Sequence, residues 1–203
     1  MPFLPDSTAF VLPLAMFAFV SSVTPGPNNV MLTASGASFG YRRSVPHMLG
    51  ICLGVVLMVL LIGAGLGKLF EAEPRIYTLL KYVGAAYLIW LAWKIARSGS
   101  VDQGKSGSQP FSFWQAAAFQ WVNPKAWVMA LGSVTSYLPA QHTPWQLLAL
   151  VGLMGVINMP TTSTWALFGS RLRRYLQEPV FLRIFNTLAA LALVASLYPL
   201  LIH

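Results

Sequence analysis

Hydrophobic residues in this chain occur in long runs separated by short polar segments. Six runs are long enough to cross a membrane as helices, because about 20 helical residues span the hydrocarbon core of a bilayer. They cover residues 8–38, 46–67, 76–96, 111–138, 145–168 and 180–202. The pattern predicts an all-α membrane protein with six transmembrane helices, in one transmembrane domain covering residues 1–203.

Proline motifs interrupt the first and the fourth run, at Pro25-Gly26-Pro27 and at Asn123-Pro124-Lys125. A proline inside a helix removes an amide donor and clashes with the preceding turn, at about 3 kcal/mol. In lipid such a broken helix persists where protein or a water-filled cavity surrounds it. Paired breaks at matching positions of two halves are typical of a transporter binding site.

Further prolines suggest that the two halves are repeats. Pro27, Pro46 and Pro74 mark the first half, and Pro124, Pro144 and Pro179 mark the second at similar intervals. We expect repeat 1 at about residues 1–97, a cytoplasmic linker at about 98–110 and repeat 2 at about 111–203. Each half has an odd number of spans, so the sequence predicts two inverted three-helix repeats.

Composition agrees with a membrane location, since 56% of the residues are hydrophobic and only 9% are charged, against about 25% charged in soluble domains. The net charge of +8 does not indicate a nucleic-acid partner, because the basic residues form short clusters between the apolar runs. Loops on one side carry eight basic residues and loops on the other carry two. By the positive-inside rule both termini are expected to be periplasmic.

The first break offers groups for both ends of an amino acid. Its two prolines free the carbonyls of Ser21 and Val23, and these can accept from an ammonium group. Asn28 and Asn29 then open a new half-helix, whose N-terminal amides favour a carboxylate. The alternative is a simple proline kink, relieved by Thr24 or Ser22.

The second break contains Lys125, deep inside the fourth run. An intramembrane lysine costs about 2.5–3.5 kcal/mol on insertion scales, so it marks a functional site by default. One interpretation is that Lys125 attracts the substrate carboxylate or exchanges a proton. The other is structural: Lys125 snorkels, or donates to the carbonyl of Gln120 that Pro124 frees.

Three groups of candidate residues follow, each with a structural alternative. The substrate-binding candidates are Pro25, Gly26, Pro27, Asn28, Asn29, Gln120, Asn123, Pro124 and Lys125. The pathway-lining candidates are Trp121, Trp127, Asn158 and Thr161, which could equally serve helix packing. The proton-responsive candidates are His47 and Lys125, and a lone histidine at an interface can also be structural.

The sequence offers little support for enzyme or metal chemistry. All five acidic residues fall at span ends or in loops, and no phosphate-loop, zinc-protease or cysteine–histidine motif is present. We therefore predict no catalytic residue, no metal site and no cofactor. An intramembrane enzyme or assembly factor using the same polar cleft remains the alternative, with a passive channel as a third option.

Glycines spaced by four residues, Gly36 with Gly40 and Gly50 with Gly54, predict close approach of the first two spans and leave homo-oligomerisation open.

The chain resembles the LysE/RhtB amino-acid exporters over essentially its whole length. The resemblance is carried by Pro25-Gly-Pro-Asn28, the glycine-spaced segment through Gly54 and Asn123-Pro-Lys125. Residues 24–29, 84–96 and 111–114 are most similar to the cysteine/O-acetylserine exporters of that family.

The resemblance implies a secondary transporter in the bacterial cytoplasmic (inner) membrane. Its implied substrates are small amino acids or their derivatives, its partners are membrane lipid and protons, and its energy source is the proton gradient. Many members carry aspartate where Asn28 stands here, so this chain lacks that carboxylate.

Overall fold

The computed structural model describes residues 7–67, 72–97 and 109–198, and every regular element within them is helical. Three helical segments are long and apolar enough to cross a membrane, at Tyr41–Leu66, Thr78–Ala96 and Pro144–Leu172. Shorter apolar helices lie at Val11–Val23 and Pro179–Ala195. Many large hydrophobic side chains on these helices are exposed, which is the pattern of a membrane protein. The predicted all-α class is confirmed.

The first proline break is present where the sequence predicts it. Helix α1 (Ser7–Val23) ends before the prolines, and α2 (Pro27–Phe39) begins at the second of them. Between the two helices Gly26 is fully extended, with φ −176° and ψ 179°. The first N–H groups of a helix have no partner within it, so a proline at this position sacrifices no helical hydrogen bond.

The second break has the same form. Helix α6 (Phe113–Phe119) continues into a 3-10 turn, η2 (Gln120–Val122), and α7 begins afresh (Pro124–Tyr137). Asn123 is extended between them, and its side-chain Oδ1 accepts from the backbone N–H of Lys125 at 3.2 Å. This cap satisfies the N–H of Lys125, which has no partner within the first turn of α7.

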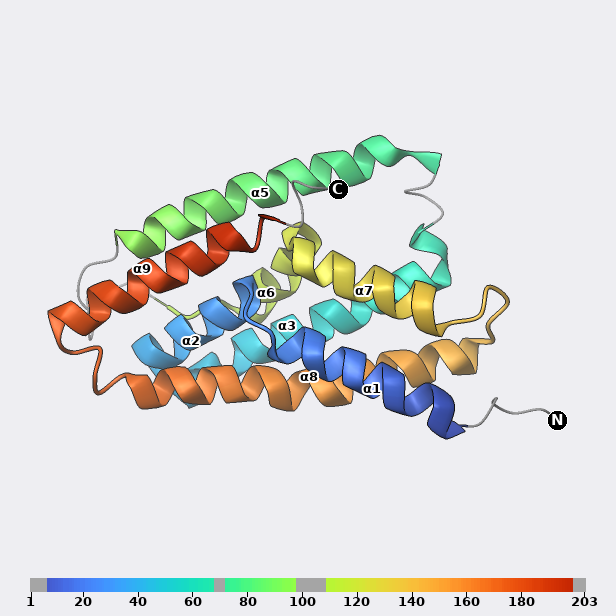
Figure 1. Cartoon of the computed structure of the whole chain (residues 1–203), viewed down its shortest axis with the longest axis horizontal. Coiled ribbons are helices and arrows are strands. Elements are labelled where there is room, and N and C mark those ends of the chain that lie inside the picture. Colours follow the sequence, from blue (N-terminus) through green and yellow to red (C-terminus); the bar gives the residue numbers. More distant parts are fainter. Residues whose placement is uncertain (1–6, 68–71, 98–108, 199–203) are drawn as a thin grey trace.

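The remaining helices are α3 (Tyr41–Leu61) with a π-helical turn η1 (Ile62–Leu66), α5 (Pro74–Ala96), α8 (Pro144–Leu172) and α9 (Pro179–Ala195). The second predicted span is corrected at its start: Pro46 lies inside α3, which begins five residues earlier at Tyr41. Figure 1 shows α1 and α2 running in succession along the long axis, and α6 and α7 running in the opposite direction.

Glycines allow close contacts between helices. A Cβ added at Gly36 would lie 2.1 Å from the carbonyl oxygen of Ala166 on α8, and one at Gly50 would lie 2.3 Å from that of Phe113 at α6. The predicted partner was therefore wrong for these glycines. They bring α2 onto α8 and α3 onto α6, joining residues from the two halves of the chain rather than the first two spans.

Candidate functional site

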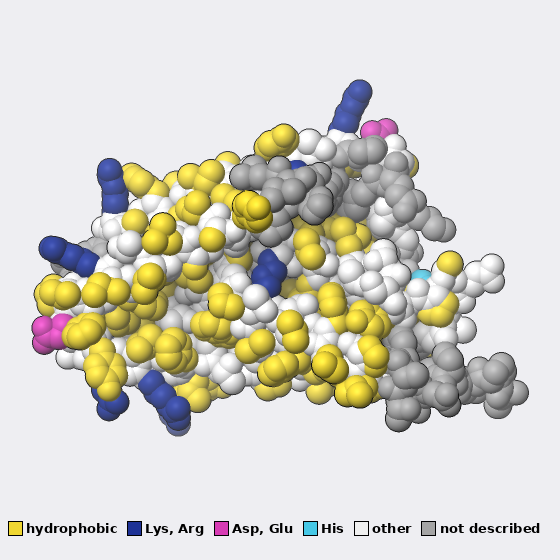
Figure 2. Space-filling model, viewed as in Figure 1, with side chains coloured by type: hydrophobic (Ala, Val, Ile, Leu, Met, Phe, Trp, Pro, Cys, Tyr) yellow, Lys and Arg dark blue, Asp and Glu magenta, His cyan; other side chains and the backbone are white. Residues whose placement is uncertain are grey.

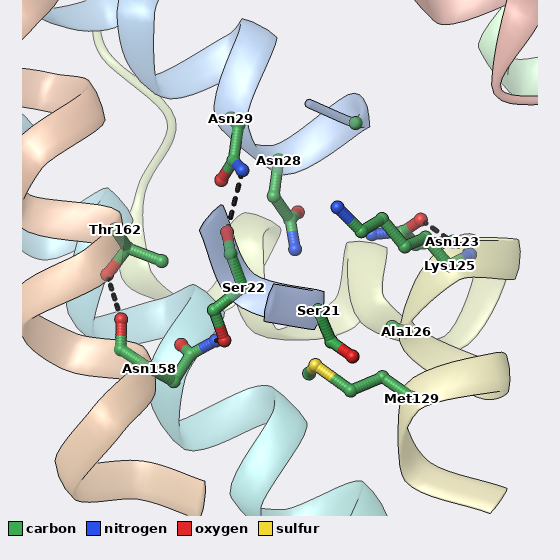
Figure 3. Close-up of a pocket in the computed structure, with 11 residues that line it drawn as sticks. Ser21, Ser22, Asn28, Asn29, Asn123, Lys125, Ala126, Met129, Asn158 and Thr162 are labelled. Atoms are coloured by element: carbon green, nitrogen blue, oxygen red, sulfur yellow. Dashed lines mark hydrogen bonds between the residues drawn. The ribbon is translucent and has the colours of Figure 1, made fainter. Parts of the chain in front are cut away.

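A pocket lies where the two broken helices meet, against α8 (Figure 3). The α1–α2 break, the start of α7 and the middle of α8 all contribute to its wall. The lining residues are Ser21, Ser22, Gly26, Asn28, Asn29, Asn123, Lys125, Ala126, Met129, Asn158 and Thr162. The structure thus brings together two motifs that lie about a hundred residues apart in the sequence.

Asn29 closes the first break from within. Its side-chain Nδ2 donates to the carbonyl oxygens of Ser22 and Thr24, each at 2.8 Å, and the residue is buried. From the sequence, the two prolines are predicted to free the carbonyls of Ser21 and Val23. The carbonyls that are bonded across the break are instead those of Ser22 and Thr24.

Lys125 joins the two breaks directly. Its Nζ donates to the carbonyl oxygen of Thr24 and lies 3.4 Å from that of Pro25. The predicted structural alternative, donation to the Gln120 carbonyl, is not the observed contact, because Nζ lies on the carbonyls across the break. The Gln120 carbonyl accepts the backbone N–H of Asn123 at 3.2 Å. Figure 3 shows Lys125 reaching from α7 toward the α1–α2 break.

A second link between the halves is made by two amides. Asn28 Nδ2 donates to Gln120 Oε1 at 2.8 Å, and Gln120 Nε2 donates back to Asn28 Oδ1 at 3.0 Å. Gln120 is fully buried, and its Nε2 also donates to the carbonyl of Ala116 at 2.9 Å. In this conformation the Asn28 side chain is therefore hydrogen-bonded to Gln120, although both residues were predicted to contact substrate.

Two buried asparagines on the pocket wall each retain one unpaired atom. Asn123 Nδ2 has no partner, and its identity as a donor is secure because Oδ1 must accept a backbone N–H. Asn158 Oδ1 also has no partner, while its Nδ2 donates to Ser22 Oγ at 3.1 Å. Buried polar atoms are normally satisfied, so the pocket presents a free donor on the α7 side and a free acceptor on the α8 side.

Some predicted residues lie outside the pocket lining. Pro25, Pro27 and Pro124 shape the breaks without lining the pocket. Trp121 and Trp127 pack edge to face at 5.8 Å, and Trp127 Nε1 donates to the carbonyl of Trp121 at 2.9 Å. These tryptophans belong to the main hydrophobic cluster.

Other predictions differ in detail. Thr161 Oγ1 donates within α8 to Ile157 at 2.7 Å, and its neighbour Thr162 lines the pocket. His47 lies in the second turn of α3 and is buried, with 2% of its surface exposed. Its ring packs against Phe111 with centroids 5.4 Å apart and is outside the pocket lining.

Five lining residues were not among the predicted candidates: Ser21, Ser22, Ala126, Met129 and Thr162. Met129 lies four residues after Lys125, and Thr162 four after Asn158, so each shares a helix face with a predicted residue. This four-residue spacing is the sequence signal that could have identified Met129 and Thr162 as lining residues. Within the described residues, no group of three histidine, cysteine or acidic side chains could hold a metal ion.

Comparison with known proteins assigns the chain to a family. Residues 19–197 match the family model described as LysE type translocator. The chain belongs to this family. No solved structure is significantly similar to it.

Curated relatives within the LysE family extend the comparison. Three of them, each named a cysteine/O-acetylserine efflux protein, come from Escherichia coli (strain K12), Shigella flexneri and Shigella sonnei (strain Ss046). Each is 34% identical over 185 residues, covering 88% of this chain and 90% of the relative. These relatives are efflux proteins and not enzymes, so they favour the transporter prediction over an intramembrane enzyme.

Proposed function

We propose that this chain is a secondary transporter that exports small neutral amino acids, of the cysteine or O-acetylserine type, from the cytoplasm. The observation that carries the proposal is Lys125 in a pocket between two broken helices. Family membership and the names of the relatives agree with it.

The pocket has the groups that a zwitterion needs. Lys125 and the unpaired Nδ2 of Asn123 are donors for a carboxylate. The carbonyls of Thr24 and Pro25, which are outside the pocket lining but contact Lys125 Nζ, and the unpaired Oδ1 of Asn158 on the pocket wall are acceptors for an ammonium group. A purely anionic or purely cationic solute would use only one of these sets.

Alternating access would follow from an inverted arrangement of two three-helix halves, making six crossings in all. The packing supports such a pseudo-symmetry, since α6 lies on α3 much as α1 lies on α8, while α3 pairs with α8 and α5 with α9. The opposite directions of α1–α2 and α6–α7 in Figure 1 also fit. Rocking of one half against the other would open the pocket to each side in turn.

We place the protein in the bacterial inner membrane, with its basic end in the cytoplasm. Figure 2 shows Lys and Arg side chains gathered at the end where α2 meets α3 and α8 meets α9, with hydrophobic side chains over the middle. Helix α1 runs toward this end and α9 runs away from it (Figure 1), which fits two periplasmic termini.

Orientation can be tested with introduced cysteines in a Cys52→Ala background. An impermeant thiol reagent added to intact spheroplasts should label Gln141→Cys and leave Gly99→Cys, in the predicted linker outside the described residues, unlabelled until the cells are lysed. Labelling of Gly99→Cys in intact spheroplasts would show that the predicted orientation is wrong.

Transport itself is tested in proteoliposomes loaded with labelled O-acetyl-L-serine or L-cysteine. We expect saturable efflux that a proton gradient accelerates. A carrier must pass through an occupied state, so its rate saturates, whereas a passive channel would give a flux proportional to concentration. Chemical conversion of the solute without its release would instead support an intramembrane enzyme. Export would be refuted if the protein neither released nor converted any small amino acid.

A further inference from the structure

We infer that Lys125 is an internal ligand: in the empty transporter its ammonium occupies the subsite that the substrate's ammonium takes during export. Because the lysine must be drawn away first, the site accepts only molecules that carry both a free carboxylate and a free ammonium group. This inference rests on the proposed export of amino acids and names the part of the substrate that the same pocket requires.

The seat of the lysine is shaped for an alkylammonium group. Two carbonyl oxygens, of Thr24 and Pro25, face Nζ just beyond the last turn of α1. The C-terminal end of a helix carries partial negative charge, which stabilises a cation there. An ammonium has three N–H donors and no acceptor, so a cluster of backbone carbonyls suits it.

Gly26 supplies the space for this seat. A Cβ at Gly26 would lie 2.6 Å from Lys125 Cδ and 3.2 Å from Nζ, so any larger residue would push the lysine off the carbonyls. Gly26 is not needed for its backbone angles, since its φ of −176° is open to every residue. The requirement is for room, and the lysine side chain uses that room.

Among the residues that the structure describes, no carboxylate pairs with Lys125. The residues that line the pocket include no aspartate or glutamate, and the charge of the lysine is balanced by carbonyl dipoles alone. A carboxylate is a stronger partner than a carbonyl for an ammonium group, especially where water is scarce. Asn123 Nδ2, buried and unpaired on the same wall, offers that carboxylate a second donor.

Substrate binding is then an exchange of partners. The incoming carboxylate takes Lys125 Nζ and Asn123 Nδ2, and the incoming ammonium takes the carbonyls of Thr24 and Pro25 that the lysine leaves. An amine without a carboxylate cannot draw the lysine away. A carboxylate without an amine removes the cation from both carbonyls and leaves the Thr24 oxygen with only the Asn29 amide as donor, which is unfavourable.

The exchange also removes a bond between the halves. Lys125 belongs to α7 and its two acceptors follow α1, so Nζ bridges residues a hundred positions apart. A bound zwitterion replaces this single bridge with two separate sets of contacts, one on each side. The Asn28–Gln120 pair and the Asn158–Ser22 hydrogen bond still link the halves.

Three small molecules separate the requirements. O-acetyl-L-serine has both groups, its isomer N-acetyl-L-serine lacks the free amine, and 2-aminoethyl acetate lacks the carboxylate. We would measure equilibrium binding of each to the purified full-length protein by calorimetry, for the unchanged chain and for Lys125→Met. Lys125→Gln is the second variant if Lys125→Met does not purify as folded protein, and Lys81→Met is the control.

The unchanged chain should bind O-acetyl-L-serine at least about tenfold more tightly than either analogue. Lys125→Met should lose that preference and gain binding of 2-aminoethyl acetate by about tenfold, because the ammonium subsite is now vacant. A lysine that only binds carboxylate, or only stabilises the fold, would not create a site for an amine. No gain of amine binding in either lysine variant overturns the inference, as does tight amine binding by the unchanged chain.

Failure of the proposed function looks different. If the unchanged chain neither binds nor exports O-acetyl-L-serine, that export is wrong, yet a gain of amine binding on removing Lys125 would still identify the ammonium subsite. If it exports O-acetyl-L-serine and the lysine variants gain nothing, export stands and the internal-ligand inference is refuted.

Discussion

Lys125→Met is expected to reduce amino-acid efflux strongly while the protein still reaches the membrane. The substitution keeps an apolar stem of similar length on α7 and removes the ammonium that we assign to the substrate carboxylate. A hydrogen bond to a charged group contributes about 1.5–3 kcal/mol, so the initial rate at low substrate should fall roughly 10- to 100-fold. The measurement is efflux from loaded proteoliposomes, normalised to the amount of protein incorporated.

Lys81→Met is the matched control. Lys81 is a half-buried lysine of α5 and lies outside the pocket lining, so the same chemical change there should leave efflux within about twofold of the unchanged chain. Equal losses in both variants would attribute the effect to charge in the membrane rather than to the site. Normal efflux by Lys125→Met would remove the lysine from the transport mechanism.

Local backbone chemistry explains which parts of the site were predictable. The breaks at Pro27 and Pro124 follow from the missing amide of proline, a property of the residue itself, and the structure ends one helix and starts another at both places. Asn123 as a helix cap belongs to the same class of local effect.

Long-range partners were not predictable from one sequence. Asn28 and Gln120 are 92 residues apart, and Lys125 and Thr24 are 101 apart, so these contacts depend on how the helices pack. The prolines predict that carbonyls are freed, but they do not predict which donor bonds to those carbonyls. His47 shows the same limit, since its burial against Phe111 depends on the segment that precedes α6.

Gly36→Ala is expected to destabilise the protein, whereas Gly152→Ala is expected to stabilise it slightly. At Gly36 the new methyl would lie 2.1 Å from the backbone oxygen of Ala166, and backbone cannot rotate aside as a flexible side chain can. Helices α2 and α8 would have to separate, and overpacking of this kind costs about 1–3 kcal/mol. Because α2 also forms one wall of the pocket, the separation should reduce efflux as well.

Gly152, within α8, provides the opposite expectation from the same chemical change. No heavy atom lies within 4 Å of the position its Cβ would take, and alanine is favoured over glycine inside a helix by up to about 1 kcal/mol. Thermal unfolding of the detergent-solubilised proteins should therefore shift down for Gly36→Ala and up for Gly152→Ala. Gly169→Ala should behave like Gly36→Ala, since its Cβ would meet the carbonyl oxygen of Thr33 at 2.1 Å. Similar shifts in all three variants would mean that α2 and α8 do not approach as closely as these glycines allow.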